Sequence, residues 1–158
     1  ARNDTKYIVN HKLEDLNADT YTIVDTDNLT GTTGATTQAA AKEYTGFTAQ
    51  KFEQKTIAAN GSTVVDIYYT RNSYKITYNI VGNYFPQEGY AEDTYEYGDK
   101  VVAEAEPVKV GYEFSGWAEI PETMPAENVI ASGEFTANKD TVYTVEVMYS
   151  DEEIEDYL

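Results

Sequence analysis

The stretch GYEFSGWAEIPETMP, residues 111–125, is the most informative part of this chain. It combines glycine with three aromatic side chains, which include the only tryptophan, Trp117, and with two of the four prolines. Its opening recurs in the first half of the chain as Gly46-Phe47-Thr48. The stretch contains no recognisable catalytic motif. The stretch therefore gives information about the fold and about an internal repeat rather than about a catalytic site.

Composition favours a small protein built from strands. The 15 tyrosines and the many threonines and valines suit a pleated, half-buried surface better than a helix. Hydrophobic residues make up 41% of the sequence, which is enough for a folded core. A length of 158 residues allows one large domain or two small ones.

The charge balance excludes several classes of partner and chemistry. The formal net charge is −17, from 28 acidic and 11 basic residues, and such a field repels nucleic acid and anionic membrane surfaces. The absence of cysteine excludes disulfides, zinc–thiolate sites and thiol nucleophiles. No run of about 18 apolar residues is present, so we expect no membrane insertion.

The first residues indicate that the chain is a segment of something longer. It starts at Ala1-Arg2-Asn3 without a signal peptide. The pair Arg2-Asn3 recurs as Arg71-Asn72, and in both places a tyrosine soon opens a strand pattern. We interpret residues 1–3 as the tail of an earlier unit in a tandem array.

Alternation of apolar and polar residues predicts strands in the first half of the chain. Residues 7–13 place Tyr7, Val9, His11 and Leu13 on one face. Further strands are predicted over residues 20–29 and 63–70, with extended structure over 47–57. The alanine-rich residues 36–42 predict two turns of helix, and Asn60-Gly61 predicts a type I′ hairpin turn.

The second half repeats this series with an irregular period. The alternating stretch Tyr74 to Ile80 aligns with the first strand at Tyr7, and residues 145–150 align with the closing residues 65–70. Strands are also predicted over residues 90–97 and 141–150, with a short segment over 101–105. The predicted fold class is α+β, mostly β, with each unit ordered strand, strand, short helix, strand, strand. The predicted domains are 1–72 and 73–158, joined by a linker of roughly two to four residues.

Several of these motifs resemble bacterial surface repeats. Residues 74–149 resemble the Listeria–Bacteroides repeat, to which the internalin B repeat belongs, through YKITY at 74–78, GYEFSGW at 111–117 and IPETMPA at 120–126. Residues 6–71 resemble the mucin-binding-protein repeat through Leu29-Thr30-Gly31, Gly46-Phe47 and Ile67-Tyr68-Tyr69. Both resemblances imply a β-grasp, ubiquitin-like fold on a cell-wall or secreted protein of a Gram-positive bacterium.

Candidate reactive residues are few. His11 is the single histidine, and its place on the apolar face of a strand favours packing over the proton transfer that a catalytic triad requires. Two acidic clusters could hold calcium: Asp25-Thr26-Asp27-Asn28 and the run 151–156, which begins Asp151-Glu152-Glu153. The first lacks the glycine and closing glutamate of an EF-hand loop, and the second is typical of a solvated tail. We predict no catalytic, cofactor or metal site, and no cofactor.

Trp117, Tyr112 and Phe114 could form an aromatic platform for a sugar ring, but core packing is the simpler interpretation. The sequons Asn28-Leu29-Thr30 and Asn60-Gly61-Ser62 are interpreted as chance matches. Two functions stay open. One is a non-catalytic spacer whose partners are the neighbouring repeats of its own polypeptide. The other is an adhesion module that binds a host glycan, mucin or a host surface protein. An enzyme is the least favoured alternative.

Overall fold

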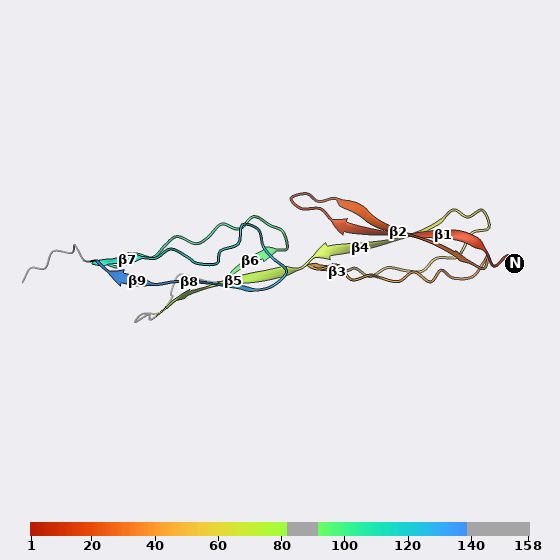
Figure 1. Cartoon of the computed structure of the whole chain (residues 1–158). Coiled ribbons are helices and arrows are strands. Elements are labelled where there is room, and N and C mark those ends of the chain that lie inside the picture. The colour runs from red at the N-terminus through yellow and green to blue at the C-terminus, as the bar shows by residue number, and fades with distance from the viewer. Residues whose placement is uncertain (82–91, 139–158) are drawn as a thin grey trace, which may run out of the picture.

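The computed structural model describes residues 1–81 and 92–138, which form strands joined by turns and extended segments (Figure 1). The strands are β1 (Thr5–Glu14), β2 (Tyr21–Gly31), β3 (Phe47–Ala49), β4 (Thr63–Arg71), β5 (Ser73–Ile80), β6 (Asp93–Glu96), β7 (Tyr112–Phe114), β8 (Val129–Gly133) and β9 (Phe135–Ala137). We call residues 5–72 the N-terminal unit and the described residues from 73 to 138 the C-terminal unit. No helix that could cross a membrane occurs in the described part of the chain.

The N-terminal unit is built on one mixed sheet in the order β2-β1-β4-β3. β1 runs antiparallel to β2 and parallel to β4, so that Val9 lies opposite Val65. Because side chains alternate between the faces of a strand, one face of β1 and β4 forms the core. The buried hydrophobic side chains of this core are Tyr7, Val9, Ala39, Ile57, Val65, Ile67 and Tyr69. The alternation predicted for residues 7–13 is confirmed.

The segment between β2 and β3 is extended, so the predicted helix over residues 36–42 is wrong. Several of its peptide groups bond to the side chains of Gln54 and Tyr69 rather than to one another. The Gln54 side chain accepts a hydrogen bond from the Ala39 N–H at 2.9 Å and donates one to the Ala39 carbonyl at 2.7 Å. The Tyr69 hydroxyl accepts one from the Lys42 N–H at 2.9 Å. These tertiary partners satisfy the backbone, and alanine's helix propensity is too weak to compete.

A turn exists at Asn60-Gly61, but the strands that flank it do not pair directly beside it. Gly61 has φ 74°, and its N–H donates to the Ala58 carbonyl at 3.1 Å. The strand that follows, β4, pairs in parallel with β1 and meets β3 only at its far end, from Ala49 opposite Tyr69 onward. A turn is confirmed here, but the predicted type I′ geometry is wrong, because Gly61 has positive φ and Asn60 does not. The two flanking segments pair antiparallel, as predicted, but only over β3.

The C-terminal unit repeats this arrangement with shorter strands. β5 runs antiparallel to β6 and parallel to β8 in a sheet ordered β6-β5-β8, and β7 pairs with β9. Tyr78 is 2% exposed, and burial, together with a hydrogen bond from its hydroxyl to Asp93, raises the pKa of Tyr78 to about 12. The other buried side chains of its hydrophobic cluster are Ile76, Val101, Met124 and Ala131.

Matching backbone hydrogen bonds align the two units. In each unit, a positive-φ glycine donates to the carbonyl of a buried apolar residue, and an asparagine donates to the carbonyl of a second positive-φ glycine. The equivalent pairs are Gly34 and Gly98, Ile57 and Met124, Gly46 and Gly111, and Asn72 and Asn138. The repeat seen in the sequence is therefore a structural repeat of the backbone path.

The predicted alignment is wrong in its register. Among the described residues, β8 stands beside β5 as β4 stands beside β1, so β8 corresponds to the first part of β4. Tyr7, opposite Thr63, corresponds to Ile76, opposite Val129, rather than to Tyr74. Residues 139–158, which include the predicted strand over 141–150, lie outside the described residues. Alternation alone cannot distinguish a shift of two residues, because such a shift keeps every side chain on the same face.

The two units lie end to end and form an elongated molecule (Figure 1). β4 of the N-terminal unit runs almost directly into β5 of the C-terminal unit. Each unit has its own hydrophobic cluster. The place where the units meet is therefore a joint between two cored bodies.

Candidate functional site: the joint between the units

One residue, Asn72, separates β4 from β5. Its N–H donates to the carbonyl of Gly46 at 2.8 Å, and its own carbonyl accepts from the N–H of Tyr97 at 2.8 Å. Its side-chain amide donates to the Tyr74 hydroxyl at 3.2 Å. Asn72 is therefore bonded to both units through its main chain, and the connection is shorter than the predicted linker.

Arg71 carries the charge at the joint. Its side chain is 7% exposed, and Nη1 donates to Asp99 at 2.6 Å and to the Tyr97 carbonyl at 3.1 Å. Nη2 lies 3.0 Å from a carboxylate oxygen of Glu96 and 3.9 Å from one of Glu14. Glu14 also accepts from the Arg71 backbone N–H at 2.9 Å. The last residue of β4 thus binds carboxylates of both units.

Neighbouring groups hold these carboxylates in place. The second oxygen of Asp99 accepts from the Glu96 N–H at 2.9 Å, which fixes the carboxylate toward Arg71. Burial opposes the charged guanidinium, but hydrogen bonding to Asp99 and the three nearby carboxylates outweigh burial and raise the pKa of Arg71. The planar guanidinium binds several acceptors at once, which a lysine ammonium on its flexible stem does less well.

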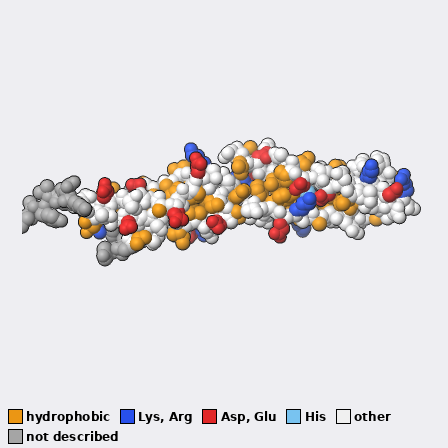
Figure 2. Space-filling view, in the orientation of Figure 1, with side chains coloured by type: hydrophobic (Ala, Val, Ile, Leu, Met, Phe, Trp, Pro, Cys, Tyr) orange, Lys and Arg blue, Asp and Glu red, His pale blue; other side chains and the backbone are white. Residues whose placement is uncertain are grey.

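Apolar contacts surround this ion-pair cluster. The Phe47 and Tyr97 rings meet edge-on, with centroids 5.6 Å apart. A Cβ on Gly46 would lie 2.6 Å from the Tyr97 ring, and one on Gly98 would lie 2.6 Å from the Leu16 side chain in the β1–β2 turn. Both glycines also have positive φ, 87° and 86°, so a side chain would be strained at either position. Figure 2 shows hydrophobic side chains gathered toward the middle of the visible face, where the units meet.

Sequence reasoning found one part of the joint and missed the rest. The recurrence of Arg-Asn marked Arg71 and Asn72 as a junction. The partners of Arg71 are acids in a chain with 28 of them, so no local pattern distinguishes Glu14, Glu96 and Asp99. Their place beside Arg71 depends on the turns that end β1 and β6.

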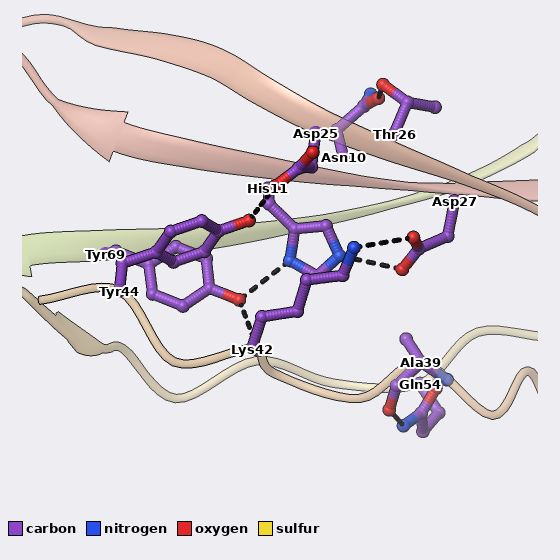
Figure 3. Close-up of polar contacts among 10 residues, drawn as sticks. All are labelled: Asn10, His11, Asp25, Thr26, Asp27, Ala39, Lys42, Tyr44, Gln54 and Tyr69. Carbon is purple, nitrogen blue, oxygen red and sulfur yellow. Dashed lines mark hydrogen bonds and ion pairs between the residues drawn. The ribbon is translucent and has the colours of Figure 1, made fainter.

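His11 lies in a second polar cluster, inside the N-terminal unit (Figure 3). Its side chain is 0% exposed, with Nε2 2.8 Å from an oxygen of Asp27 and Nδ1 2.7 Å from the Tyr69 hydroxyl. Lys42 pairs with the other oxygen of Asp27 at 3.0 Å. An ionised carboxylate only accepts, so His11 donates from Nε2. The ring is enclosed and bonded on both sides, which is the geometry of a structural histidine rather than of a proton shuttle.

Removing the Tyr69 hydroxyl should destabilise the N-terminal unit. Tyr69→Phe leaves the Lys42 N–H and His11 Nδ1 without a partner, so we expect the free energy of unfolding to fall by about 1–3 kcal/mol. Denaturant unfolding followed by circular dichroism measures this change. Tyr68→Phe is the matched control, because Tyr68 is 40% exposed. Equal effects of the two substitutions would contradict a structural role for the buried cluster.

Asp25 and Asp27, the candidate calcium ligands, bind other side chains of the N-terminal unit. Asp25 accepts from the Tyr44 hydroxyl at 2.5 Å, and Asp27 is shared between His11 and Lys42. Among the described residues, no group of three or more acidic or histidine side chains is arranged to hold a metal ion. The acidic run 151–156 lies outside the described residues.

Acid should weaken the Asp27 contribution. The hydrogen bond from His11, followed by that from Lys42, lowers the pKa of Asp27 below its ordinary value of 3.8. A carboxyl group whose pKa is lower in the folded than in the unfolded state stabilises the fold at pH values above its unfolded-state pKa. This stability is lost as the pH falls through the folded-state pKa. We expect Asp27→Asn to cost about 1 kcal/mol at pH 6 and less below about pH 4, measured by urea unfolding across that range. A cost that grows on acidification would contradict this assignment, and Asp19→Asn, in the exposed β1–β2 turn, controls for loss of a charge.

The aromatic residues of the 111–125 stretch do not form one exposed platform. Trp117 packs edge-on against Tyr78 and Phe114, each at a centroid distance of 4.9 Å, and its indole N–H donates to the Glu104 carbonyl at 3.0 Å. Tyr112 is 40% exposed at the far end of the C-terminal unit. The structure thus separates Trp117, in the packing layer, from Tyr112 on the surface.

No family model matches this chain, and no curated protein matches it. Among solved structures, it is similar to Streptococcal High Identity Repeats in Tandem (SHIRT) domains 3–4 from a cell surface protein, at 14% identity over 84% of this chain and 99% of that chain, with a TM-score of 0.30. It is also similar to Mub-RV, at 13% identity over 85% of this chain and 99% of that chain, with a TM-score of 0.30. At these values neither likeness assigns a function to this chain.

Proposed function

We propose that this chain is a non-catalytic tandem-repeat segment that acts as a stalk or spacer. In this role it presents other domains at a distance from a bacterial surface, as part of an extracellular cell-wall or secreted protein. Residues 1–72 and 73–158 act as its two domains. The observation that carries the proposal is the joint, in which Asn72 alone connects the units and Arg71 binds acids of both.

The physical argument is one of stiffness. A spacer must resist bending. A flexible linker does not keep two domains at a fixed separation, because its end-to-end distance grows only with the square root of the number of residues. Here a one-residue connection is held by backbone hydrogen bonds, ion pairs and ring contacts. The strongly acidic composition adds solubility and opposes self-association.

Spin labels placed in each unit of the full chain test this proposal. Distances measured by electron–electron double resonance should form one narrow distribution, and small-angle scattering should give the profile of a rod. A broad distribution centred on bent arrangements would overturn the spacer function. In cells, lengthening a displayed protein with copies of this segment should move a terminal tag outward in proportion to copy number.

One observation favours adhesion as a second candidate function. The outer face of the N-terminal sheet presents Tyr21 and Tyr68, whose rings meet edge-on at 5.0 Å, with the Lys12 ammonium 5.2 Å from the Tyr68 centroid. Tyr21 is 38% exposed, and Ile23, beside it on β2, is 49% exposed. Exposed aromatic rings next to polar groups suit weak binding of a host glycan or surface protein.

A mucin or glycan array probed with the full chain distinguishes the two candidates. Saturable binding that is lost in the double variant Tyr21→Ala, Tyr68→Ala would support adhesion. Binding that survives this double variant, or no binding at all, would contradict it. Tyr112→Ala is a matched control, because it removes an aromatic ring of similar exposure from the other unit.

A further inference from the structure

The far end of the C-terminal unit has the same backbone as the end of the N-terminal unit that receives its neighbour. Gly46 and Gly111 have φ of 87° and 83°. Asn72 donates to the Gly46 carbonyl at 2.8 Å, and Asn138 donates to the Gly111 carbonyl at 2.9 Å. The residue after each glycine is aromatic and begins a short strand, β3 or β7. We call the surface formed by Gly111, Tyr112 and Asn138 the distal pole.

Among the described residues, different groups pack over the two surfaces. At Gly46, the Tyr97 ring of the next unit lies where a Cβ would be, and it packs edge-on against Phe47. At Gly111, no described atom lies within 4 Å of the corresponding position. Tyr112, which corresponds to Phe47, is 40% exposed. The distal pole is therefore equivalent to the surface at Gly46 that contacts the next unit, but no described residue packs over its glycine.

We propose that the distal pole is a docking surface for a further unit of the same kind, one that presents a Tyr-Gly turn like Tyr97-Gly98. The partner ring would lie over Gly111 against Tyr112, and its backbone N–H would bond near Asn138, as Tyr97 bonds to Asn72. The proposal rests on the spacer function and names the partner that would continue the rod.

The same contacts predict which partner is excluded. In the N-terminal unit, the residues equivalent to Tyr97-Gly98 are Thr33-Gly34. A threonine carries no ring to place over Gly111, so a copy of the N-terminal unit should dock poorly. Ala137 replaces Arg71 at the distal pole, so docking there depends on the ring and the backbone and not on an ion-pair cluster.

A three-unit chain tests the proposal with an internal reference. Residues 139–158 are replaced by a second copy of residues 73–138, and spin labels report the distance across the first joint and across the new one. We expect the distribution across the new joint to be at least about twofold narrower than in a control chain that carries residues 3–72 at that place instead. Replacing the tyrosine equivalent to Tyr97 with alanine in the added copy should remove this difference without altering the distal pole.

Each outcome has a defined meaning. Distance distributions of equal width for the two added units, or no effect of the tyrosine substitution, would overturn the proposed docking surface. If the distribution across the first joint is still narrow, the spacer function is not contradicted. A broad first joint would overturn the spacer function itself. Gly111→Val, which fills the seat, should broaden only the second joint. A Gly111→Val chain whose C-terminal unit fails to fold is replaced by the tyrosine variant in the added copy.

Discussion

Arg71→Met is expected to turn the rod into two loosely jointed units. The substitution keeps an unbranched apolar stem but removes the guanidinium that binds Asp99 at 2.6 Å and Glu96 at 3.0 Å. The remaining carboxylates, with Glu14 nearby, then repel one another across the joint. We expect the distance distribution between spin labels in the two units to broaden and the scattering profile to lose its rod-like form.

The expected loss in free energy of unfolding is about 1–3 kcal/mol. Removing one member of a fully buried ion pair costs more, but Glu96 is 45% exposed and Asp99 is 31% exposed, so water replaces part of the lost interaction. The folded cores of both units should persist, because the buried clusters do not include Arg71. The substitution is therefore expected to change the relative orientation of the two units more than the folding of either unit.

Arg2→Met is the matched control for this experiment. Arg2 occupies the same Arg-Asn pair at the start of the chain, but its side chain is 76% exposed and pairs only with the neighbouring Asp4 among the described residues. We expect no change in the distance distribution. An Arg71→Met chain as narrow in its distribution as the wild type would show that hydrogen bonds and ring contacts alone hold the joint.

Trp117→Ala is expected to unfold the C-terminal unit under mild conditions. The indole fills the space between Tyr78 and Phe114, and its N–H satisfies the Glu104 carbonyl. Truncating a packed tryptophan typically costs about 3–5 kcal/mol, a large share of the stability of a unit this small. Urea unfolding followed by hydrogen exchange and mass spectrometry should show early loss of protection in β5 and β8, with β1 and β4 unchanged.

Tyr112→Ala provides the comparison for Trp117. Tyr112 is 40% exposed, and the Lys109 ammonium lies 4.1 Å from its ring centroid, so its removal should cost less than about 1 kcal/mol. A Trp117→Ala chain that keeps its stability but loses a glycan interaction would instead support the aromatic-platform hypothesis. The pair of variants therefore separates packing from ligand binding.

The opening strands of both units were predictable from sequence because period-2 alternation is a local property. Val9 and His11 in β1 and Ile76 and Tyr78 in β5 point inward as the pattern indicates. β8 was not predicted as a strand, because the five residues from Val129 to Gly133 give too little alternation to recognise. Its role became clear only from its parallel pairing with β5.

The sequence by itself determined that this is a two-part, strand-rich, acidic chain with a repeated Arg-Asn junction and aromatic–glycine motifs. Tertiary structure alone decided the path of residues 36–42, the parallel pairing of β8 with β5 and the partners of Arg71. The physical reason is the range of the interactions involved. Alternation and turn preference depend on neighbouring residues. The Gln54 and Tyr69 side chains that satisfy the extended segment, and the carboxylates that bind Arg71, come from distant parts of the chain that only the folded backbone brings together.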